Sequence, residues 1–277
     1  LGLLFAPSLP LILYGVVAEV SIDELFIAGI LPGVLMLILM SAYCLWMSRS
    51  QRRPTTRFSM REVGAALWDS IWELPLPVIV LGGIYGGYLA VSEAAVVTAL
   101  YVTFVELVIH RDLSPKQLPE IVRQSMLLVG GILLILGVSL ASTNYVIDAQ
   151  VPEMLIGLVR QYVTGATSFL WLLFLFLLVL GAILDIFSAL VLVVPLILPV
   201  AAEYGIDPIH LGIVFLATMQ LGYLTPPIGL NLFVSSYRFD QSIVRVYSAT
   251  FPFLMVLAAS VLVITFWPSL SLVLLER

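Results

Sequence analysis

The chain is too apolar for a water-soluble protein. Of its 277 residues, 61% are hydrophobic and 10% are charged, whereas soluble domains average about 45–50% and about 25%. The net charge of −5 comes without a basic patch, which argues against nucleic acid as a partner, and the single cysteine, Cys44, excludes an intrachain disulfide. These features predict an all-α integral membrane protein that lies in a lipid bilayer.

Apolar runs of about 20 residues recur along the chain, which is the length that crosses a bilayer as a helix. The run at 168–203 is double, because Asp185 divides it into halves of 17 and 18 residues. These halves could be two short spans or one re-entrant hairpin, and the hairpin is the preferred interpretation. The predicted spans cover residues 1–16, 24–47, 74–90, 92–110, 126–149, 168–203, 207–237 and 246–272.

The basic residues between the spans predict the orientation. Ten of the twelve Lys and Arg residues fall in loops that the spans place on one side, and the positive-inside rule assigns that side to the cytoplasm. Two stretches, 58–72 and 151–163, mix apolar and charged residues at near-helical spacing. We expect both to be helices that lie in the membrane interface.

A repeated pattern of glycine and proline indicates an internal duplication. Pro7 follows Gly2 at the same spacing as Pro227 follows Gly222, with an offset of 220 residues. The same offset relates the prolines of the next spans, Pro32 and Pro252. Because the first copy is predicted to run outward and the second inward, this is the pattern of an inverted-topology repeat, common in secondary transporters. The alternative is chance, since Gly and Pro are frequent in membrane helices.

The second copy should contain a broken helix. Thr225, Pro226 and Pro227 lie between Gly222 and Gly229, and proline removes a backbone donor and clashes with the preceding turn. Freed carbonyl groups at membrane depth need polar surroundings, and carbonyl and hydroxyl oxygens are ligands for hard cations. The sequence therefore predicts a cation site here, with a healed proline kink as the alternative.

Asp185 is a second candidate cation ligand. No basic residue lies near it in LGAILDIFSAL, and an ionised carboxylate inside a membrane costs at least about 2.5 kcal/mol. Ser188 lies on the same helix face, three residues later. A cation or a proton would compensate the charge of Asp185, whereas the alternative is a helix-capping residue near one membrane surface.

Other polar residues are expected to serve the helices. Ser92 and Glu93 suit an N-cap followed by a carboxylate in the first turn. Asp207 and Pro208 suit another helix start, which leaves His210 as an interfacial residue. No HExxH, GxSxG or phosphate-binding loop is present, so the motifs do not predict an enzyme.

The motifs, taken in order, resemble the large membrane (M) subunit of tripartite ATP-independent periplasmic (TRAP) transporters. They are GLLFAPSLPLILYG, LFIAGILPG, LPVIVLGGIYGGY before SEAA, LGAILDIFSALVLVVPLILPVA, GIDPIHLGIV and LGYLTPPIGLNLFV. The likeness covers essentially the whole chain. Because the first hairpin of that family would lie upstream of Leu1, we expect the sequence to be roughly the C-terminal two thirds of such a subunit.

The resemblance implies an elevator mechanism, in which a transport domain of hairpins and broken helices moves against a scaffold. Residues 1–16, the remainder of the first broken helix, and 168–237, the second hairpin and broken helix, would belong to the transport domain. Residues 17–73 would form a scaffold helix with a cytoplasmic basic loop and an interfacial helix. Residues 74–167 would be central helices with the outer interfacial helix, and 238–277 the C-terminal scaffold helix.

The resemblance also implies binding residues for Na+ and solute. The Na+ site of the second repeat would be formed by Asp185, Ser188, Gly222, Thr225, Pro226 and Gly229. A partial Na+ site of the first repeat would be formed by Gly2, Pro7 and Ser8. The solute would contact Asn231, Ser188 and Ser8.

The implied function is Na+-coupled uptake of a small organic acid, such as a C4-dicarboxylate or sialic acid, across the bacterial inner membrane. Na+ would be the coupling ion, and no organic cofactor is expected. The implied partners are a small membrane (Q) subunit and a periplasmic solute-binding (P) protein that hands over the carboxylate. Two alternatives are an elevator exchanger without a binding protein and, less favoured, a membrane enzyme that uses Asp185.

Overall fold

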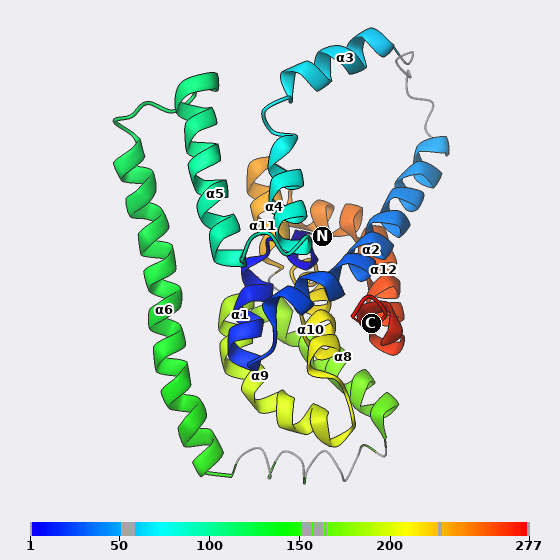
Figure 1. The fold of residues 1–277 in the computed structure, drawn as a ribbon. Helices are drawn as coiled ribbons and strands as arrows, with labels where there is room; N and C mark the ends of the chain where they lie inside the picture. The colour runs from blue at the N-terminus through cyan, green and yellow to red at the C-terminus, as the bar shows by residue number, and fades with distance from the viewer. Residues whose placement is uncertain are drawn as a thin grey trace. The chain divides into compact units, whose positions relative to one another are not determined.

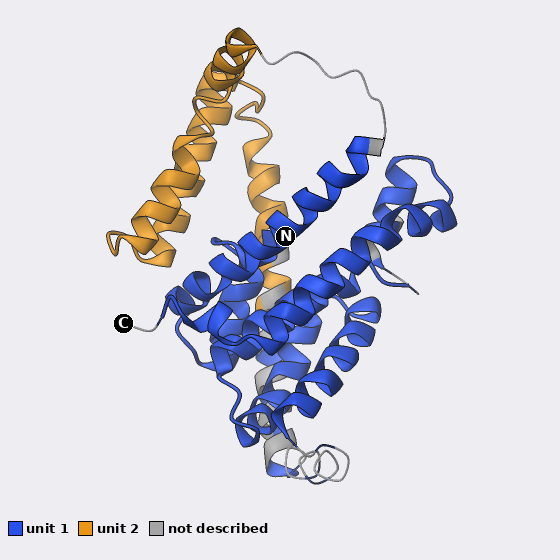
Figure 2. Cartoon of the chain, turned by 90° about the vertical axis from the view of Figure 1, so that its right-hand side faces the viewer, with its two compact units in different colours: residues 1–50, 134–277 blue, residues 51–133 orange. Residues whose placement is uncertain are grey.

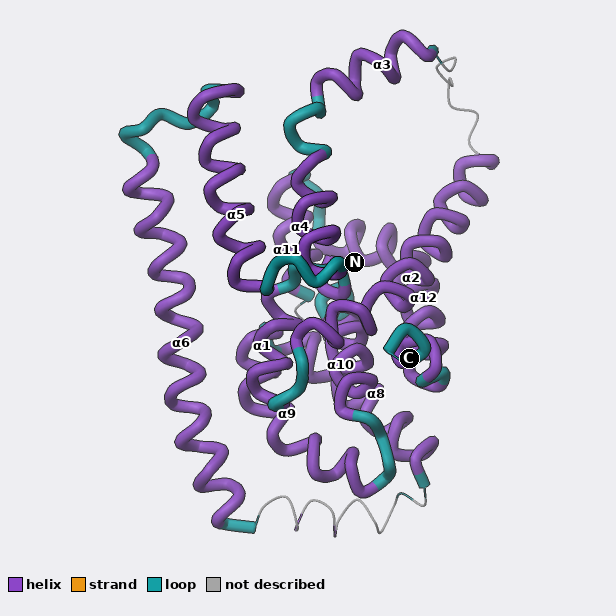
Figure 3. The backbone as a smooth tube through the Cα atoms, in the orientation of Figure 1, coloured by secondary structure: helices purple, strands orange, loops and turns teal. Residues whose placement is uncertain are grey.

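The structure, a computed structural model, describes residues 2–50, 59–150, 154, 157, 163, 165–226 and 229–275. Within these residues the regular elements are helices and no strand occurs, which confirms the all-α fold (Figures 1 and 3). The chain forms two compact units (Figure 2). The first consists of Leu1–Ser50 with Leu134–Arg277, and the second of Gln51–Leu133.

Most of the predicted spans are helices in the structure. Those long and apolar enough to cross a membrane are α2 (Ile22–Ser50), α5 (Val91–Phe104) continued by the π-helical segment η2 (Val105–His110), α8 (Ala166–Ile183), α9 (Ile186–Glu203) and α12 (Ile243–Phe266). Shorter apolar helices are α1 (Leu9–Ala18), α4 (Pro75–Tyr85) and α10 (Pro208–Gly222). The predicted span 126–149 matches the C-terminal part of a longer helix, α6 (Leu118–Asp148), which ends one residue earlier than the span.

The helix α10 is the centre of the first unit. Its residues from His210 to Gly222 are all buried, and it packs against α8, α2, α12, α9 and α1. The helix begins where predicted, because Oδ1 of Asp207 accepts hydrogen bonds from the N–H groups of Ile209 and His210 at 2.8 and 3.2 Å and Pro208 occupies the first turn. The predicted cap is thus confirmed.

His210, near the start of α10, is packed inside the protein, and its place at the depth of the membrane interface stays a prediction. Its side chain is 1% exposed, with Nδ1 lying 3.2 Å from Oγ of Ser271 and Nε2 lying 3.3 Å from the carbonyl oxygen of Thr265. These partners lie at the end of α12 and in the short helix α13 (Ser269–Leu272). The C-terminal segment therefore covers the start of α10, which no local sequence pattern indicates.

Glycines allow two neighbours to approach α10 closely. A Cβ added to Gly222 would lie 2.6 Å from the backbone of Gly181 in α8, so the two backbones are in contact. A Cβ added to Gly212 would lie 2.5 Å from the ring of Tyr14 in α1. The hydroxyl of Tyr14 donates to the carbonyl oxygen of Pro208 at 2.6 Å, which fixes α1 along α10.

Both copies of the predicted repeat contain an interrupted helix. The 3-10 turn η1 (Gly2–Leu4) precedes α1, and α11 (Leu230–Arg238) follows α10 after residues 223–229. Shifted by 220 residues, the bounds of α1 become 229–238 and nearly coincide with those of α11. In Figure 1 the chain runs downward through η1 and α1 and upward through α10 and α11, so the two broken helices have opposite directions. Pro227 lies outside the described residues.

The second unit contains the helices of the central region. The predicted helix at 58–72 is α3 (Met60–Asp69), whose start is capped by Ser59; its place in an interface stays a prediction. The other stretch, 151–163, lies outside the described residues apart from 154, 157 and 163. Helix α5 starts earlier than expected, so Ser92 is not its N-cap: the carboxylate of Glu93 accepts the N–H of Ala90 at 3.0 Å and closes the first turn itself.

Candidate functional site

The helices α8 and α9 form a hairpin whose tip contains Asp185. Oδ2 of Asp185 accepts hydrogen bonds from the N–H groups of Phe187 and Ser188, each at 3.0 Å, and Oδ1 accepts one from the hydroxyl of Ser188. Asp185 is therefore the N-cap of α9, as the capping alternative expects, while its depth in the membrane stays a prediction. The carboxylate keeps capacity for a further ligand, because Oδ1 accepts one hydrogen bond and has a second lone pair that can bind a cation.

The hairpin tip lies against the end of α10. The backbone contact between Gly181 and Gly222 joins the last turn of α8 to the last residue of α10. One residue beyond that contact, the hydroxyl of Tyr223 accepts a hydrogen bond from the N–H of Ile186, the first residue of α9. Two independent contacts thus place the tip beside the interruption between α10 and α11.

The interruption brings backbone carbonyl groups together. Gly229 has φ +52°, and a Cβ added to it would lie 3.1 Å from the carbonyl oxygen of Thr225 and 3.4 Å from that of Tyr223. No residue in the described ranges donates a hydrogen bond to either oxygen. The hydroxyl of Thr225 donates to the carbonyl oxygen of Leu221 at 3.0 Å and keeps its lone pairs. Oxygen ligands for a cation are therefore available on one side of this loop.

The structure gathers most of the residues predicted for the second repeat. Asp185 and Ser188 lie at the tip, and Gly222, Thr225 and Gly229 lie at the adjoining interruption. Pro226 is exposed in the same loop. The predicted solute residue Asn231 is exposed in the first turn of α11. The arrangement fits the predicted site, while cation binding itself stays a prediction.

The residues predicted for the first repeat lie around its own interruption. Gly2 is in η1 and is exposed, as is Pro7. Ser8 is 4% exposed and precedes α1, and its hydroxyl donates to the carbonyl oxygen of Leu3 at 2.7 Å. Ser8 therefore ties the two sides of the interruption together. Among the described residues, no hydrogen bond or ion pair joins Gly2, Pro7 or Ser8 to Asp185 or Asn231.

Gln220 was missed by the sequence analysis. It lies in the last turns of α10 and is 8% exposed, and its Oε1 atom is buried without a hydrogen-bond partner. A buried acceptor that is left unpaired costs about 1–3 kcal/mol. The sequence feature that could have indicated Gln220 is its amide side chain within the otherwise apolar run GIVFLATMQLG. Its position, two residues before Gly222, makes Gln220 a further candidate for binding an ion or solute.

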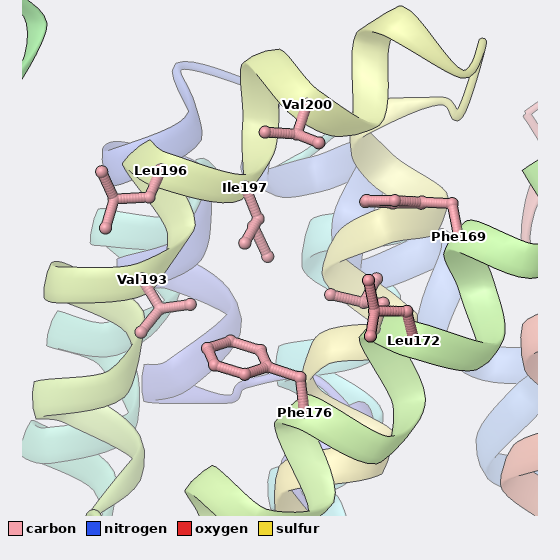
Figure 4. A pocket seen from close by; sticks show the side chains of 8 residues that line it. Phe169, Leu172, Phe176, Val193, Leu196, Ile197 and Val200 are labelled. Atoms are coloured by element: carbon pink, nitrogen blue, oxygen red, sulfur yellow. The ribbon is translucent and has the colours of Figure 1, made fainter. Parts of the chain in front are cut away.

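A separate cavity between α8 and α9 is unsuited to a carboxylate. Its volume is about 320 Å³, and its walls are apolar side chains that include Phe169, Phe176 and Ile197 (Figure 4). Transfer of an ionised group into such surroundings without a hydrogen-bond partner is strongly unfavourable. This cavity is therefore not a candidate site for a carboxylate solute.

Comparison with known proteins identifies the family. The family model "Tripartite ATP-independent periplasmic transporter, DctM component" matches residues 1–270. The chain is 34% identical to the C4-dicarboxylate TRAP transporter large permease protein DctM of Pseudomonas aeruginosa, with 99% of this chain and 64% of the relative covered. It is 32% identical to the sialic acid TRAP transporter large permease protein SiaM of Vibrio cholerae, with 100% of this chain and 65% of the relative covered.

A third relative is named DctMQ rather than DctM. The chain is 30% identical to the isethionate TRAP transporter permease protein DctMQ of Oleidesulfovibrio alaskensis, with 98% of this chain and 43% of the relative covered. The chain thus spans less than two thirds of the length of these curated relatives. Their names describe transporter subunits rather than enzymes. The match over residues 1–270 and the membrane-length helices show that this chain belongs to the DctM component family of TRAP transporters, multi-pass proteins of the bacterial inner membrane.

Proposed function

We propose that the protein takes up a small organic acid together with Na+, and that Na+ binds between the α8–α9 tip and the interruption that follows α10. The observation that carries this proposal is the attachment of the tip to the interruption through Ile186 and Tyr223 and through Gly181 and Gly222. It brings a carboxylate and a set of carbonyl and hydroxyl oxygens into one region.

The chemistry of these groups suits a hard monovalent cation. Asp185 supplies negative charge, Ser188 and Thr225 supply hydroxyl oxygens, and the loop supplies the carbonyl oxygens of Tyr223 and Thr225. Oxygen ligands of this kind replace the hydration shell of a hard cation. A bound cation would also offset the cost of keeping the Asp185 carboxylate ionised at membrane depth.

The solute is proposed to be a carboxylate, which the names of two relatives support, whereas the third relative is named for isethionate, a sulfonate. Two of them are named for C4-dicarboxylate and for sialic acid. Next to the proposed Na+ site, Gln220 offers a buried amide, and Asn231 and Ser188 offer polar side chains. Amide and hydroxyl donors orient a carboxylate without adding a fixed charge, so the solute could leave again after transport.

Transport is proposed to follow an elevator mechanism with partner chains. We treat α8 and α9 as a re-entrant hairpin, because the tip joins α10 where the helix is interrupted midway between Pro208 and Arg238. A periplasmic solute-binding protein would deliver the acid, and a small membrane subunit would complete the transporter. The relative named DctMQ is consistent with a large and a small subunit that function together.

Uptake by the full-length protein with its partner chains, reconstituted in liposomes, tests the proposal. We expect uptake of C4-dicarboxylates or sialic acid only with an inward Na+ gradient. Asp185→Asn keeps an oxygen that can cap α9 but removes the charge, so this variant should keep its thermal stability and lose Na+-dependent uptake. Asp185→Ala should lose both, with stability falling by about 0.5–2 kcal/mol. Full uptake by Asp185→Asn at low Na+ would rule out the proposed role of the charge.

A further inference from the structure

Three side chains of types that can bind a metal ion lie together in the second unit, outside the proposed transport site. Glu106, His110 and Asp112 each direct one donor atom toward the others, and the three donor atoms lie within 4.8 Å of one another. Glu106 and His110 are half-buried and Asp112 is exposed. The group occupies the end of η2 and the turn that follows it.

The local backbone explains why these side chains meet. Glu106 and His110 are four residues apart in the π-helical segment η2, which places both on one face of the helix. Arg111 then adopts φ +59°, which reverses the chain, and the N–H of Leu113 returns to the carbonyl oxygen of Glu106 at 3.4 Å. Asp112 is carried back toward the other two residues as a result.

The donor atoms of Glu106, His110 and Asp112 face one another without bonding to one another, as ligands around an ion would. Among the described residues, no hydrogen bond or ion pair joins the three side chains to one another, and no Lys or Arg pairs with either carboxylate. The neighbouring Arg111 instead directs Nε to the carbonyl oxygen of Val108 at 3.3 Å. Ligands bound about 2.0–2.2 Å from one tetrahedral ion lie about 3.4 Å apart, so side-chain rotations must bring the three donor atoms closer together to close around a metal.

We propose that Glu106, His110 and Asp112 bind one divalent transition-metal ion at the cytoplasmic end of this span. One imidazole nitrogen and two carboxylate oxygens are the donor set of mononuclear Zn²⁺, Co²⁺ or Mn²⁺ sites, whereas Mg²⁺ prefers oxygen alone. Three protein ligands leave the remaining coordination positions to water. The ion would fix the turn between η2 and α6. This turn lies outside the proposed transport site.

Equilibrium dialysis of the tag-free, full-length transporter in lipid nanodiscs with Zn²⁺ tests this site, and Co²⁺ absorption gives a second readout. The wild type should bind one Zn²⁺ per chain and give the d–d bands of Co²⁺ with a nitrogen ligand. His110→Asn, Glu106→Gln and Asp112→Asn should each weaken binding by roughly ten-fold or more.

Asp69→Asn is the matched control, since Asp69 is an exposed carboxylate at the end of α3 in the same unit. Its binding should equal that of the wild type. Thermal unfolding without metal verifies that the substituted proteins fold. Wild-type binding no greater than that of the His110→Asn variant would overturn the proposal, as would an unchanged affinity in all three variants.

Discussion

The hydroxyl of Tyr223 accepts a hydrogen bond from the backbone N–H of Ile186, and this contact joins the hairpin tip to the end of α10. The N–H groups of the first turn of a helix have no partner within the helix. In α9, Asp185 accepts those of Phe187 and Ser188, and Tyr223 accepts that of Ile186. A residue of the proposed ion-binding loop therefore helps to define where the second arm of the hairpin begins.

Tyr223→Phe should weaken this attachment while keeping the aromatic ring. The N–H of Ile186 would lose its partner at a cost of about 1–3 kcal/mol. We expect a lower thermal unfolding temperature and a tip that is more readily cleaved by protease. Tyr237→Phe is the control, because Tyr237 is 93% exposed in α11. Equal stability of the Tyr223→Phe and Tyr237→Phe proteins would contradict a structural role for the Tyr223 hydroxyl.

The contact of Gly181 with Gly222 predicts that Gly222→Ala disrupts the site. The added Cβ would lie 2.6 Å from the Gly181 backbone, which has no flexible side chain that could move away. The helices must separate, at a cost of about 1–3 kcal/mol, and we expect both the unfolding temperature and uptake to fall. Gly82→Ala in α4 has open space around it and should be neutral or slightly stabilising. A Gly222→Ala protein as stable and active as Gly82→Ala would refute the close approach.

Much of this architecture could be predicted from local residue chemistry. The interruption near Thr225, the cap at Asp207 and the opposed directions of the two broken helices follow from proline, glycine and charge placement. The first two signals act within one or two helical turns, whereas the directions follow from the basic residues in the loops between the spans. The structure agrees with them because the backbone requirements of proline and of helix ends do not depend on distant contacts.

The features that were missed or misassigned depend on packing between distant segments. His210 is buried only because residues 265–271 return to cover it. The contact of Gly181 with Gly222 requires knowledge of which helix faces meet, and a 41-residue separation leaves no local trace of it. Ser92 was assigned as a cap because its residue type suits one, whereas the Glu93 carboxylate satisfies the Ala90 N–H and α5 begins before Ser92.

Thr225→Val tests whether the Thr225 hydroxyl binds Na+. The substitution keeps the shape of the side chain and removes one oxygen. We expect the Na+ concentration for half-maximal uptake to rise by roughly ten-fold or more, since loss of a group that only supports a metal ligand already weakens binding about 10–100-fold. Thr218→Val is a close control, because Thr218 also donates to the carbonyl oxygen four residues earlier on α10, at 2.7 Å. If Thr218→Val and Thr225→Val shift the Na+ dependence equally, the effect belongs to the helix and not to an ion.

Gln220→Leu separates a binding role from a structural one, because the two roles predict opposite results. If the buried Oε1 atom of Gln220 has no function, an apolar side chain of similar size removes an unpaired polar group and should raise stability with uptake unchanged. If Gln220 binds solute or ion, uptake should fall while the unfolding temperature stays level or rises. We expect the second result, and Met219→Leu on the same helix controls for repacking. A raised KM for solute at saturating Na+ would assign the amide to the carboxylate, and a raised Na+ requirement at saturating solute would assign it to the ion.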